Sequence, residues 1–403
     1  MTVYKYVGRT KQGTQKKGVI EAANKQAAMT KLREKGINPR QLEESKSVLH
    51  MEINLGGSGG VKNQDFVIYC RQFATLIRAG ISIIEATRIL AQQSTSKPLK
   101  KALEQVEDDV RAGSPFSDAT AKFPKVFPQL FVNMVRSGEA TGNMDDTLDR
   151  LANMLEKQFN LKKKVQSTMT YPAILMVVTI LVVFFMLVFI VPTFVATFEE
   201  MDAELPLITI YTLAVSNFLK GYWWMVIGLL VVIIVGIQYL YKKNKEFHYT
   251  VHLFLLKMPI FGKLLQKSAI ARMTRTLASL FSSAVPILTA LTIVAKVVNN
   301  PVLEKVILDS RTSLEKGRSL SEPLEQSWLF PPLVTSMTRI GESTGSLDFM
   351  LEKVADFYED EVDRTVDTLK SLIEPLMILI LAGVVGLIVA AIMMPMFSMY
   401  EQM

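Results

Sequence analysis

The chain has 403 residues and a formal net charge of +7, and 49% of its residues are hydrophobic against 21% charged. Three long stretches, Val165–Phe198, Gly221–Tyr241 and Pro375–Tyr400, contain no charged residue. Each is at least as long as the roughly 20 apolar residues that span a hydrocarbon core. These stretches exclude a wholly soluble protein, and the single cysteine, Cys70, excludes an intrachain disulfide.

Residues 1–45 predict a small α/β module. Short runs of aromatic and β-branched residues predict strands, residues 25–35 predict a helix that ends at Gly36, and a last short strand follows. Residues 46–64 contain the sequence GGSGG and predict a flexible linker. Because the first residues contain no apolar run, we expect no cleavable signal peptide and a cytoplasmic N-terminus.

A helical region, residues 65–170, comes next. Apolar residues recur at spacings of three and four from Phe66 to Ile77, which predicts an amphipathic helix, and Gly80 is placed to cap its end. Cys70 lies on this apolar stripe. We therefore interpret it as a small buried hydrophobic residue rather than a reactive thiol.

The charges around the first two spans, residues 171–196 and 221–241, predict their orientation. Lysines precede the first span and follow the second, whereas the connection at residues 197–220 is acidic; the residues are Lys157, Lys162, Lys163, Lys164, Lys242, Lys243 and Lys245 against Glu199, Glu200, Asp202 and Glu204. Since cytoplasmic flanks are enriched in lysine and arginine, we expect the connection to lie outside. Leu205–Leu219 is too short to span and is either an interfacial helix or an outward extension of the second span.

A second helical region, residues 242–372, precedes the third span, residues 373–397, and a short tail, residues 398–403, that we expect outside. The third span carries small residues about four apart: Ala382, Gly383, Gly386 and Ala390. This face is suited either to lipid or to close packing on another span or subunit. The spans hold no ionisable side chain of the kind that intramembrane catalysis or transport requires.

An internal duplication explains the odd number of spans. Gly138-Glu139-Ala140-Thr141-Gly142 reappears 203 positions later as Gly341-Glu342-Ser343-Thr344-Gly345. The same shift relates Arg136 to Arg339, Pro172 to Pro375, and Pro192 to Pro395. Upstream, with one residue of slippage, Gly113 aligns with Gly317. Both copies should enter the membrane from the same side, so the middle span returns the chain.

The repeated G-E-x-T-G segments have two interpretations. They are tight corners between helices, with positive φ at Gly142 and Gly345 and with Asn143 and Ser346 as N-caps. Alternatively, their charged residues contact a partner protein; these residues are Arg136, Glu139, Arg339 and Glu342.

No motif for catalysis or cofactor binding is evident. The sequence contains no G-x-x-x-x-G-K-[ST] phosphate loop. His248 and His252 are one helical turn apart but lack a third metal ligand, and Asp145, Asp146 and Asp149 are candidates for a hard cation only at helical spacing. We expect no cofactor and no catalytic residue. Nucleic-acid binding is not expected either, because the lysines are explained by the membrane flanks.

The chain resembles the PilC and GspF family of polytopic inner-membrane platform proteins from type IV pilus and type II secretion machines. The resemblance rests on the tandem G-E-x-T-G regions, on Tyr4-Lys5-Tyr6, and on the stretch from Lys164-Val165 through Tyr171-Pro172 to Val191-Pro192. Thr168 departs from the family pattern, and Ser283-Ala284 replaces Ala79-Gly80 in the second copy.

The resemblance implies a non-enzymatic protein of the bacterial plasma membrane that couples a separate cytoplasmic ATPase to insertion of pilin or pseudopilin subunits. It also implies other inner-membrane assembly proteins, membrane lipids and further copies of the chain as partners. A non-catalytic subunit of a transporter or channel is the alternative. The predicted fold is mainly α, with three transmembrane helices, two homologous cytoplasmic helical-bundle domains and the N-terminal α/β module.

Overall fold

The computed structural model describes residues 2–10, 15–22, 25–34, 37–44, 60–200, 206–259 and 261–402. It contains two compact units, Met1–Gly60 and Val61–Met403, which are considered separately. Most of the predicted linker, residues 46–59, and the acidic residues Asp202 and Glu204 lie outside the described residues.

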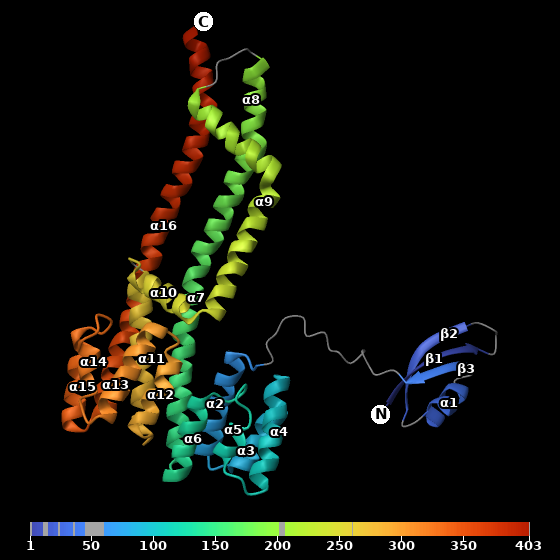
Figure 1. The fold of residues 1–403 in the computed structure, drawn as a ribbon, viewed down its shortest axis with the longest axis vertical. Coiled ribbons are helices and arrows are strands. Elements are labelled where there is room, and N and C mark those ends of the chain that lie inside the picture. Colours follow the sequence, from blue (N-terminus) through green and yellow to red (C-terminus); the bar gives the residue numbers. More distant parts are fainter. Residues whose placement is uncertain are drawn as a thin grey trace. The chain divides into compact units, whose positions relative to one another are not determined.

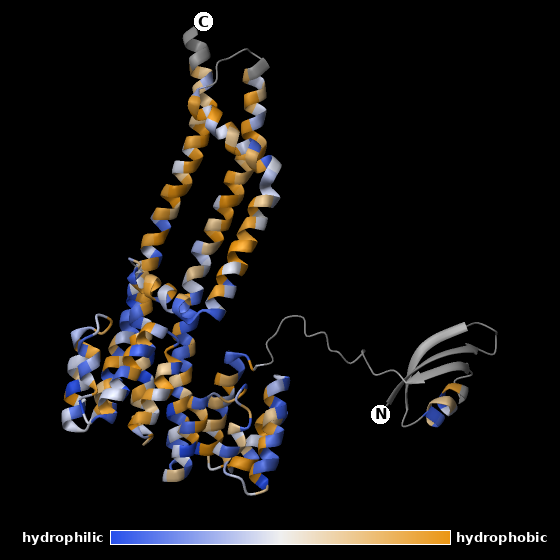
Figure 2. Cartoon of the chain, viewed as in Figure 1, coloured by the Kyte–Doolittle hydropathy of each residue, from blue (hydrophilic) through white to orange (hydrophobic). Residues whose placement is uncertain are grey.

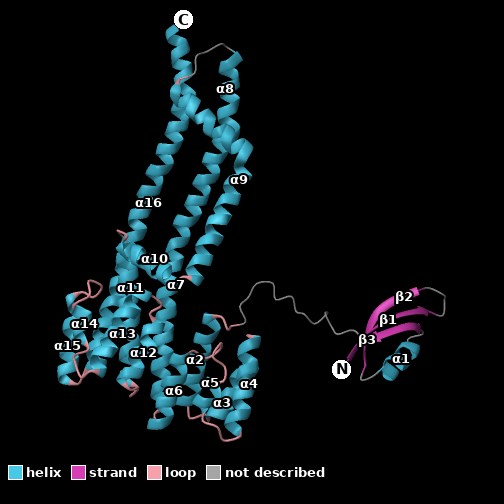
Figure 3. Ribbon diagram, viewed as in Figure 1, coloured by secondary structure: helices cyan, strands magenta, loops and turns pink. Residues whose placement is uncertain are grey.

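The first unit contains a three-stranded sheet and one helix (Figure 3). Its elements are β1 (Thr2–Thr10), β2 (Gln15–Ala22), α1 (Lys25–Glu34) and β3 (Ile37–Glu44). The strand order is β2-β1-β3, and both pairings are antiparallel, with a register shift between Val7 and Gly8. α1 buries Ala28 and Leu32, which lie four positions apart and so share one helix face.

The first repeat begins the second unit. Its helices are α2 (Asn63–Arg78), α3 (Ile83–Gln93), α4 (Lys97–Arg111), α5 (Phe116–Ala121) and α6 (Gln129–Thr141). The apolar face of α2 is buried among aromatic rings, with Phe73 and Phe116 stacked at 5.1 Å between centroids. Cys70 is buried on this face as predicted, and burial raises the pKa of its thiol, which suppresses reactivity.

A nearly continuous helix carries the chain from the first repeat through the first apolar stretch (Figures 1 and 2). It consists of α7 (Met144–Phe185), the π-helix η1 (Met186–Ile190) and α8 (Val191–Glu200). The π-turn ends two residues before Pro192, whose missing N–H disturbs the regular hydrogen-bond ladder. The Ser216 hydroxyl donates a hydrogen bond of 2.5 Å to the carbonyl of Leu187 within this turn.

α9 (Leu207–Lys243) forms the middle span, and α10 (Lys245–Lys257) follows after Asn244, whose backbone is extended. The backbone at Tyr222 is non-helical, with φ −124° and ψ 18°, so α9 is kinked there. The segment before the kink is thus helical and joined to the span, which is compatible with both predicted alternatives. The Asn244 side chain accepts hydrogen bonds from the backbone of Glu246 and Phe247 and caps α10.

The second repeat follows the order of the first. Its helices are α11 (Phe261–Ser282), α12 (Ile287–Val297), α13 (Pro301–Glu315), α14 (Ser321–Glu325), α15 (Pro332–Thr344) and the long α16 (Leu347–Gln402). Pro172 and Pro375 lie inside α7 and α16. Both helices begin well before these prolines, so each span is entered within an uninterrupted helix.

Three helices in the described part of the chain are long and apolar enough to span a membrane: Met144–Phe198, Leu207–Tyr241 and Leu347–Phe397. They pack together far from the repeats, where Leu187, Val191 and Val195 contact Ile388 and Ile392. The small residues of the third span, by contrast, are all exposed. That face therefore does not pack on another span of the same chain, which leaves lipid or another subunit as its neighbour.

The αL position at the end of the first helix of each repeat gives a stability prediction. Gly80 has φ +82°, whereas its counterpart in the second repeat, Ala284, has φ +56°. A non-glycine residue costs about 1 kcal/mol in this region. Ala284→Gly should therefore raise, and Gly80→Ala lower, the free energy of unfolding by about 1 kcal/mol. Melting of the full chain in detergent measures both, and a shift in the same direction for the two variants would contradict the backbone argument.

Candidate functional site

The glutamates of the G-E-x-T-G corners bind the backbone of their own repeats. The Glu139 carboxylate accepts hydrogen bonds from the backbone N–H of Phe116 at 2.6 Å and of Ser117 at 3.2 Å, at the start of α5. In the second repeat, Glu342 accepts from the backbone N–H of Leu320 at 2.8 Å. A carboxylate at a helix N-terminus satisfies donors that have no partner within the helix. Both glutamates are thus engaged internally.

The corner glycines are required by geometry. Gly142 and Gly345 end α6 and α15 with φ +74° and +73°, which confirms the positive φ expected from the sequence. A Cβ atom at Gly341 would lie 2.9 Å from the Cα atom of Leu347, so this glycine allows α15 and α16 to approach closely. Gly138 is similarly close to Thr147, at 3.1 Å.

The hydroxyls of the corners complete the helix ends. Thr141 and Thr344 donate to carbonyls four residues earlier, those of Ser137 and Ile340. Asn143 is the N-cap residue of α7, as predicted, but its side chain makes no capping hydrogen bond.

The corner arginines remain at the surface. Arg136 pairs with Asp118 at 2.8 Å, and Arg339 pairs with Glu325 at 2.5 Å. The Arg136 and Arg339 side chains are 52% and 61% exposed. Exposed ion pairs of this kind contribute about 0 to 1 kcal/mol, so both guanidinium groups are available to a partner at little cost to the fold.

A second duplicated feature was not recognised in the sequence. Arg71 on α2 donates hydrogen bonds to Glu156 at 2.7 Å, to Asp149 at 3.1 Å, and to Asn153 on α7. Each of these residues has a counterpart in the second repeat that makes the corresponding cluster, where Arg275 on α11 contacts Glu352, Asp356 and Glu359 on α16. In each repeat, an arginine thereby fastens the first helix to the long helix that enters the apolar region.

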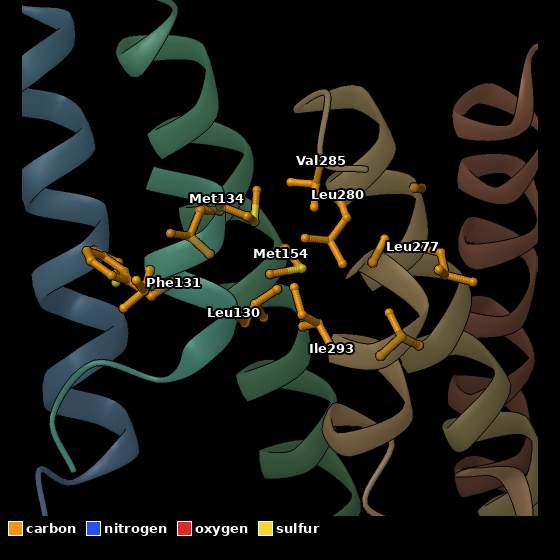
Figure 4. Close-up of a cluster of buried hydrophobic side chains, with 14 of the residues drawn as sticks. Leu130, Phe131, Met134, Met154, Leu277, Leu280, Val285 and Ile293 are labelled. Atoms are coloured by element: carbon orange, nitrogen blue, oxygen red, sulfur yellow. The ribbon is translucent and has the colours of Figure 1, made fainter. Parts of the chain in front are cut away.

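The two repeats share one hydrophobic core (Figure 4). Leu130, Met134 and Met154 on α6 and α7 meet Leu280 and Ile293 on α11 and α12, together with Val285 from the turn between those two helices. Phe131 and Leu277 continue this core into the first and the second repeat, respectively. All eight side chains are at most 6% exposed. We call this contact the joint.

Polar contacts surround the joint. The Ser137 hydroxyl donates to the carbonyl of Ser283, and the Gln158 amide donates to the Thr276 hydroxyl at 3.1 Å. Lys157 of α7 bridges to Asp356 at 3.3 Å and to Glu359 at 3.2 Å on α16. Lys157 therefore connects the first repeat to the Arg275 cluster of the second.

A cavity of about 330 Å³ opens beside the joint and is lined by charged side chains from both repeats, among them Asp149, Arg150, Lys157, Arg275 and Glu352. Its charges are already paired within the chain, because Asp149 accepts from both Arg71 and Arg78. The charged side chains that line the cavity thus form ion pairs within the chain and are not free to bind a ligand.

The predicted cation candidates do not converge. Asp149 pairs with arginines, and Asp146 pairs with Arg150 at 2.8 Å. Within the described ranges, no three Asp, Glu, His or Cys side chains gather as metal ligands. His252 instead lies 2.9 Å from the Tyr241 hydroxyl, where it fixes α10 to the end of α9.

The remaining signature residues lie on the apolar helices and not at the corners. Tyr171, which is 48% exposed, and Pro172 belong to α7, Pro192 to α8, and Pro375 and Pro395 to α16. The structure therefore separates the predicted residues into two groups: one that shapes the corners of the repeats and one that shapes the spans.

Comparison with known proteins places these features in a family. The family described as type II secretion system (T2SS), protein F, matches the chain twice, over residues 69–192 and 273–395, and its N-terminal domain matches residues 1–43. The double match confirms the duplication inferred from the sequence.

Relatives are similar over nearly the whole chain. The type IV pilus assembly protein PilC of Thermus thermophilus is 39% identical over 400 residues, which are 99% of this chain and 98% of that protein. PilC of Myxococcus xanthus is 38% identical, covering 97% of this chain and 93% of its own length. The type II secretion system protein F of Pseudomonas aeruginosa is 32% identical, covering 100% and 99%.

The Arg275 cluster gives a pH-dependent prediction. Burial raises the pKa of Asp356, but Arg275 and Lys157 together bring it below its ordinary value, and the hydrogen bond from Arg71 lowers the pKa of Glu156. Carboxyl groups with lowered pKa stabilise the fold above their unfolded pKa of about 4, and this stability is lost as the pH falls through the lowered value.

Arg275→Gln should therefore destabilise the chain by about 1 to 3 kcal/mol at pH 7, and the difference from wild type should shrink towards pH 3.5. The midpoint of urea unfolding, measured across this range, tests the expectation. The exposed Arg339→Gln serves as the control and should change stability by less than about 1 kcal/mol. If the difference in stability between wild type and Arg275→Gln stays constant with pH, the effect of Arg275 comes from packing and not from charge.

Proposed function

The chain belongs to the type II secretion system protein F family, and we propose that it is the membrane platform of a type IV pilus or type II secretion machine. In this role, it couples a separate cytoplasmic ATPase to the insertion of pilin or pseudopilin subunits into a growing filament. The observation that supports the proposal most strongly is the joint, since it unites two helical repeats that each continue without a break into an apolar helix.

The proposed mechanism is mechanical transmission. α7 and α16 each extend from a helical bundle into the apolar region, and the lysine bridges from Lys157 and Lys164 hold the two helices together just before that region. A continuous α-helix transmits displacement along its axis because every turn is hydrogen-bonded to the next. A push by an ATPase on either repeat therefore moves both spans, next to which a subunit with its own apolar segment resides in the bilayer.

The proposed orientation puts both repeats in the cytoplasm. The lysines that flank the first two spans support this, since positive flanks stay on the cytoplasmic side. The N-terminus is then cytoplasmic and the C-terminus external, in the plasma membrane of a bacterium. Between the two machines, we favour pilus assembly, because the relatives named for it reach the higher identities.

Deletion of the gene tests the function. We expect surface filaments, or secretion, to be lost, while pilin-like subunits are still processed and held in the membrane, because energy supply and subunit maturation belong to other proteins. Electron microscopy of filaments and immunoblots of the processed subunits measure this. Filament assembly and secretion at wild-type levels in a clean deletion would refute the platform function and favour a transporter subunit.

Labelling tests the orientation. In intact spheroplasts, a membrane-impermeant thiol reagent should modify Glu200→Cys but neither Lys163→Cys nor Lys243→Cys. Native Cys70 is buried and should not interfere. The reverse labelling pattern would contradict the proposed topology.

An ion-pair swap tests whether Arg136 contacts a partner. Arg136→Asp breaks the pair with Asp118, and Arg136→Asp combined with Asp118→Arg restores an ion pair at the same place with the charges exchanged. Partner contact predicts that both variants lose filament assembly or secretion while their melting stays within about 1 kcal/mol of wild type. Full rescue by the exchanged pair would instead assign Arg136 to the internal ion pair alone.

The equivalent exchange of Arg339 with Glu325 is the matched experiment in the second repeat. It shows whether the same partner contact has been kept in both copies of the duplication.

A further inference from the structure

The second repeat exposes large apolar side chains on one face. Ile340 on α15 and Phe349 and Phe357 on α16 are 44%, 52% and 45% exposed. Among the described residues of the first repeat, Val61 to Val165, the large hydrophobic side chain with comparable exposure is Ile68. An apolar face of this kind outside the spans indicates a binding surface.

This exposed face is the counterpart of the face that the first repeat uses in the joint. The shift of 203 positions relates Phe357 to Met154, which is 1% exposed within the joint. It also relates Ile340 to Ser137, which donates a hydrogen bond to the carbonyl of Ser283. In the first repeat, this face is thus buried against the second repeat. The equivalent face of the second repeat has no such neighbour and is exposed.

The surface that the second repeat contributes to the joint also has an exposed equivalent, which lies on the first repeat. On the second repeat, it is formed by Leu280, Ser283 and Val285, whose counterparts in the first repeat are Leu76, Ala79 and Ile81. Ala79 is exposed, and Leu76 and Ile81 are half-buried, whereas Leu280 and Val285 are buried by the joint.

We propose that these two open faces bind each other between copies of the chain. The α15–α16 face of one copy, with Ile340 and Phe357, docks on the face of a second copy that carries Leu76, Ala79 and Ile81, and so repeats the joint between molecules. Such an interface is heterologous, and it is extended by each added copy unless the assembly closes into a ring.

The geometry of the internal joint makes this repetition compatible with a membrane. α7 and α16 leave the joint side by side and run in the same direction (Figure 1). If successive copies are related as the two repeats are within one chain, their apolar helices therefore stay parallel and lie within one bilayer. The inference concerns self-assembly and does not depend on the function proposed above.

The charges differ between the internal joint and its repetition. Within the chain, Lys157 forms ion pairs with Asp356 and Glu359. In a contact between copies, the equivalent of Lys157 is Asp360. The equivalents of the two acidic residues are Asn153 and Glu156. Between copies, Asp360 therefore approaches a carboxylate instead of forming a bridge. The contact between copies is apolar and weaker than the internal one, and salt strengthens it because salt screens the repulsion.

Disulfide crosslinking between two differently tagged copies tests the contact. Ile340→Cys in one copy and Ala79→Cys in the other reproduce the pair formed internally by Ser137 and Ser283. In membranes that contain both copies, mild oxidation should join the two tags. The matched control pairs Ile340→Cys with Glu104→Cys, which lies on the exposed side of α4, and it should give no crosslink. The absence of a crosslink for the first pair, or equal crosslinking of the control, overturns the proposal.

Light scattering of the full chain in detergent gives an independent measurement. Ile340→Glu combined with Phe357→Glu should reduce association at least tenfold, whereas Thr312→Glu, exposed on α13, should not. Wild-type association should increase between low and high salt. A wild-type chain that stays monomeric, or a double variant that associates as well as wild type, contradicts the proposal. If the double variant associates normally but loses an ATPase, the face belongs to that partner instead.

Discussion

The joint between the repeats is the contact on which the rest of the structure depends. Six buried side chains from α6, α7, α11, α12 and the turn between α11 and α12 pack there into one core. Each buried large apolar side chain contributes about 1.5 to 3 kcal/mol, so their sum is comparable to the whole stability of a typical domain. The repeats therefore behave as one body, and the two long helices that leave them have a fixed spacing where they enter the apolar region.

The duplication explains both the symmetry of this body and its departures from symmetry. Each repeat keeps the arginine cluster and the glutamate that binds a helix N-terminus, because each requires them to hold its own helices together. The copies differ where they touch. Ser283 offers its carbonyl to Ser137, and the next residue, Ala284, adopts a left-handed conformation that Gly80 adopts without strain in the first repeat. Contact with the other repeat thus accompanies a local strain.

Local and periodic features could be predicted from the sequence, and long-range pairs could not. The apolar period of α2, the charge-free spans and the positive φ at Gly142 are encoded within a few neighbouring residues. The partners of Arg71 lie 78 to 85 positions away, and no local pattern indicates them. The joint was hidden for a different reason, because Met134 and Met154 have the spacing of ordinary core residues.

The most direct test of the account measures whether the two repeats move as one body. Spin labels at Glu104→Cys on α4 and Thr312→Cys on α13 report the distance between the repeats in the full chain, reconstituted in lipid. A pulsed electron resonance experiment should give a single narrow distance distribution. A broad or bimodal distribution would mean that the repeats move independently, and it would contradict the transmission of force through a common joint.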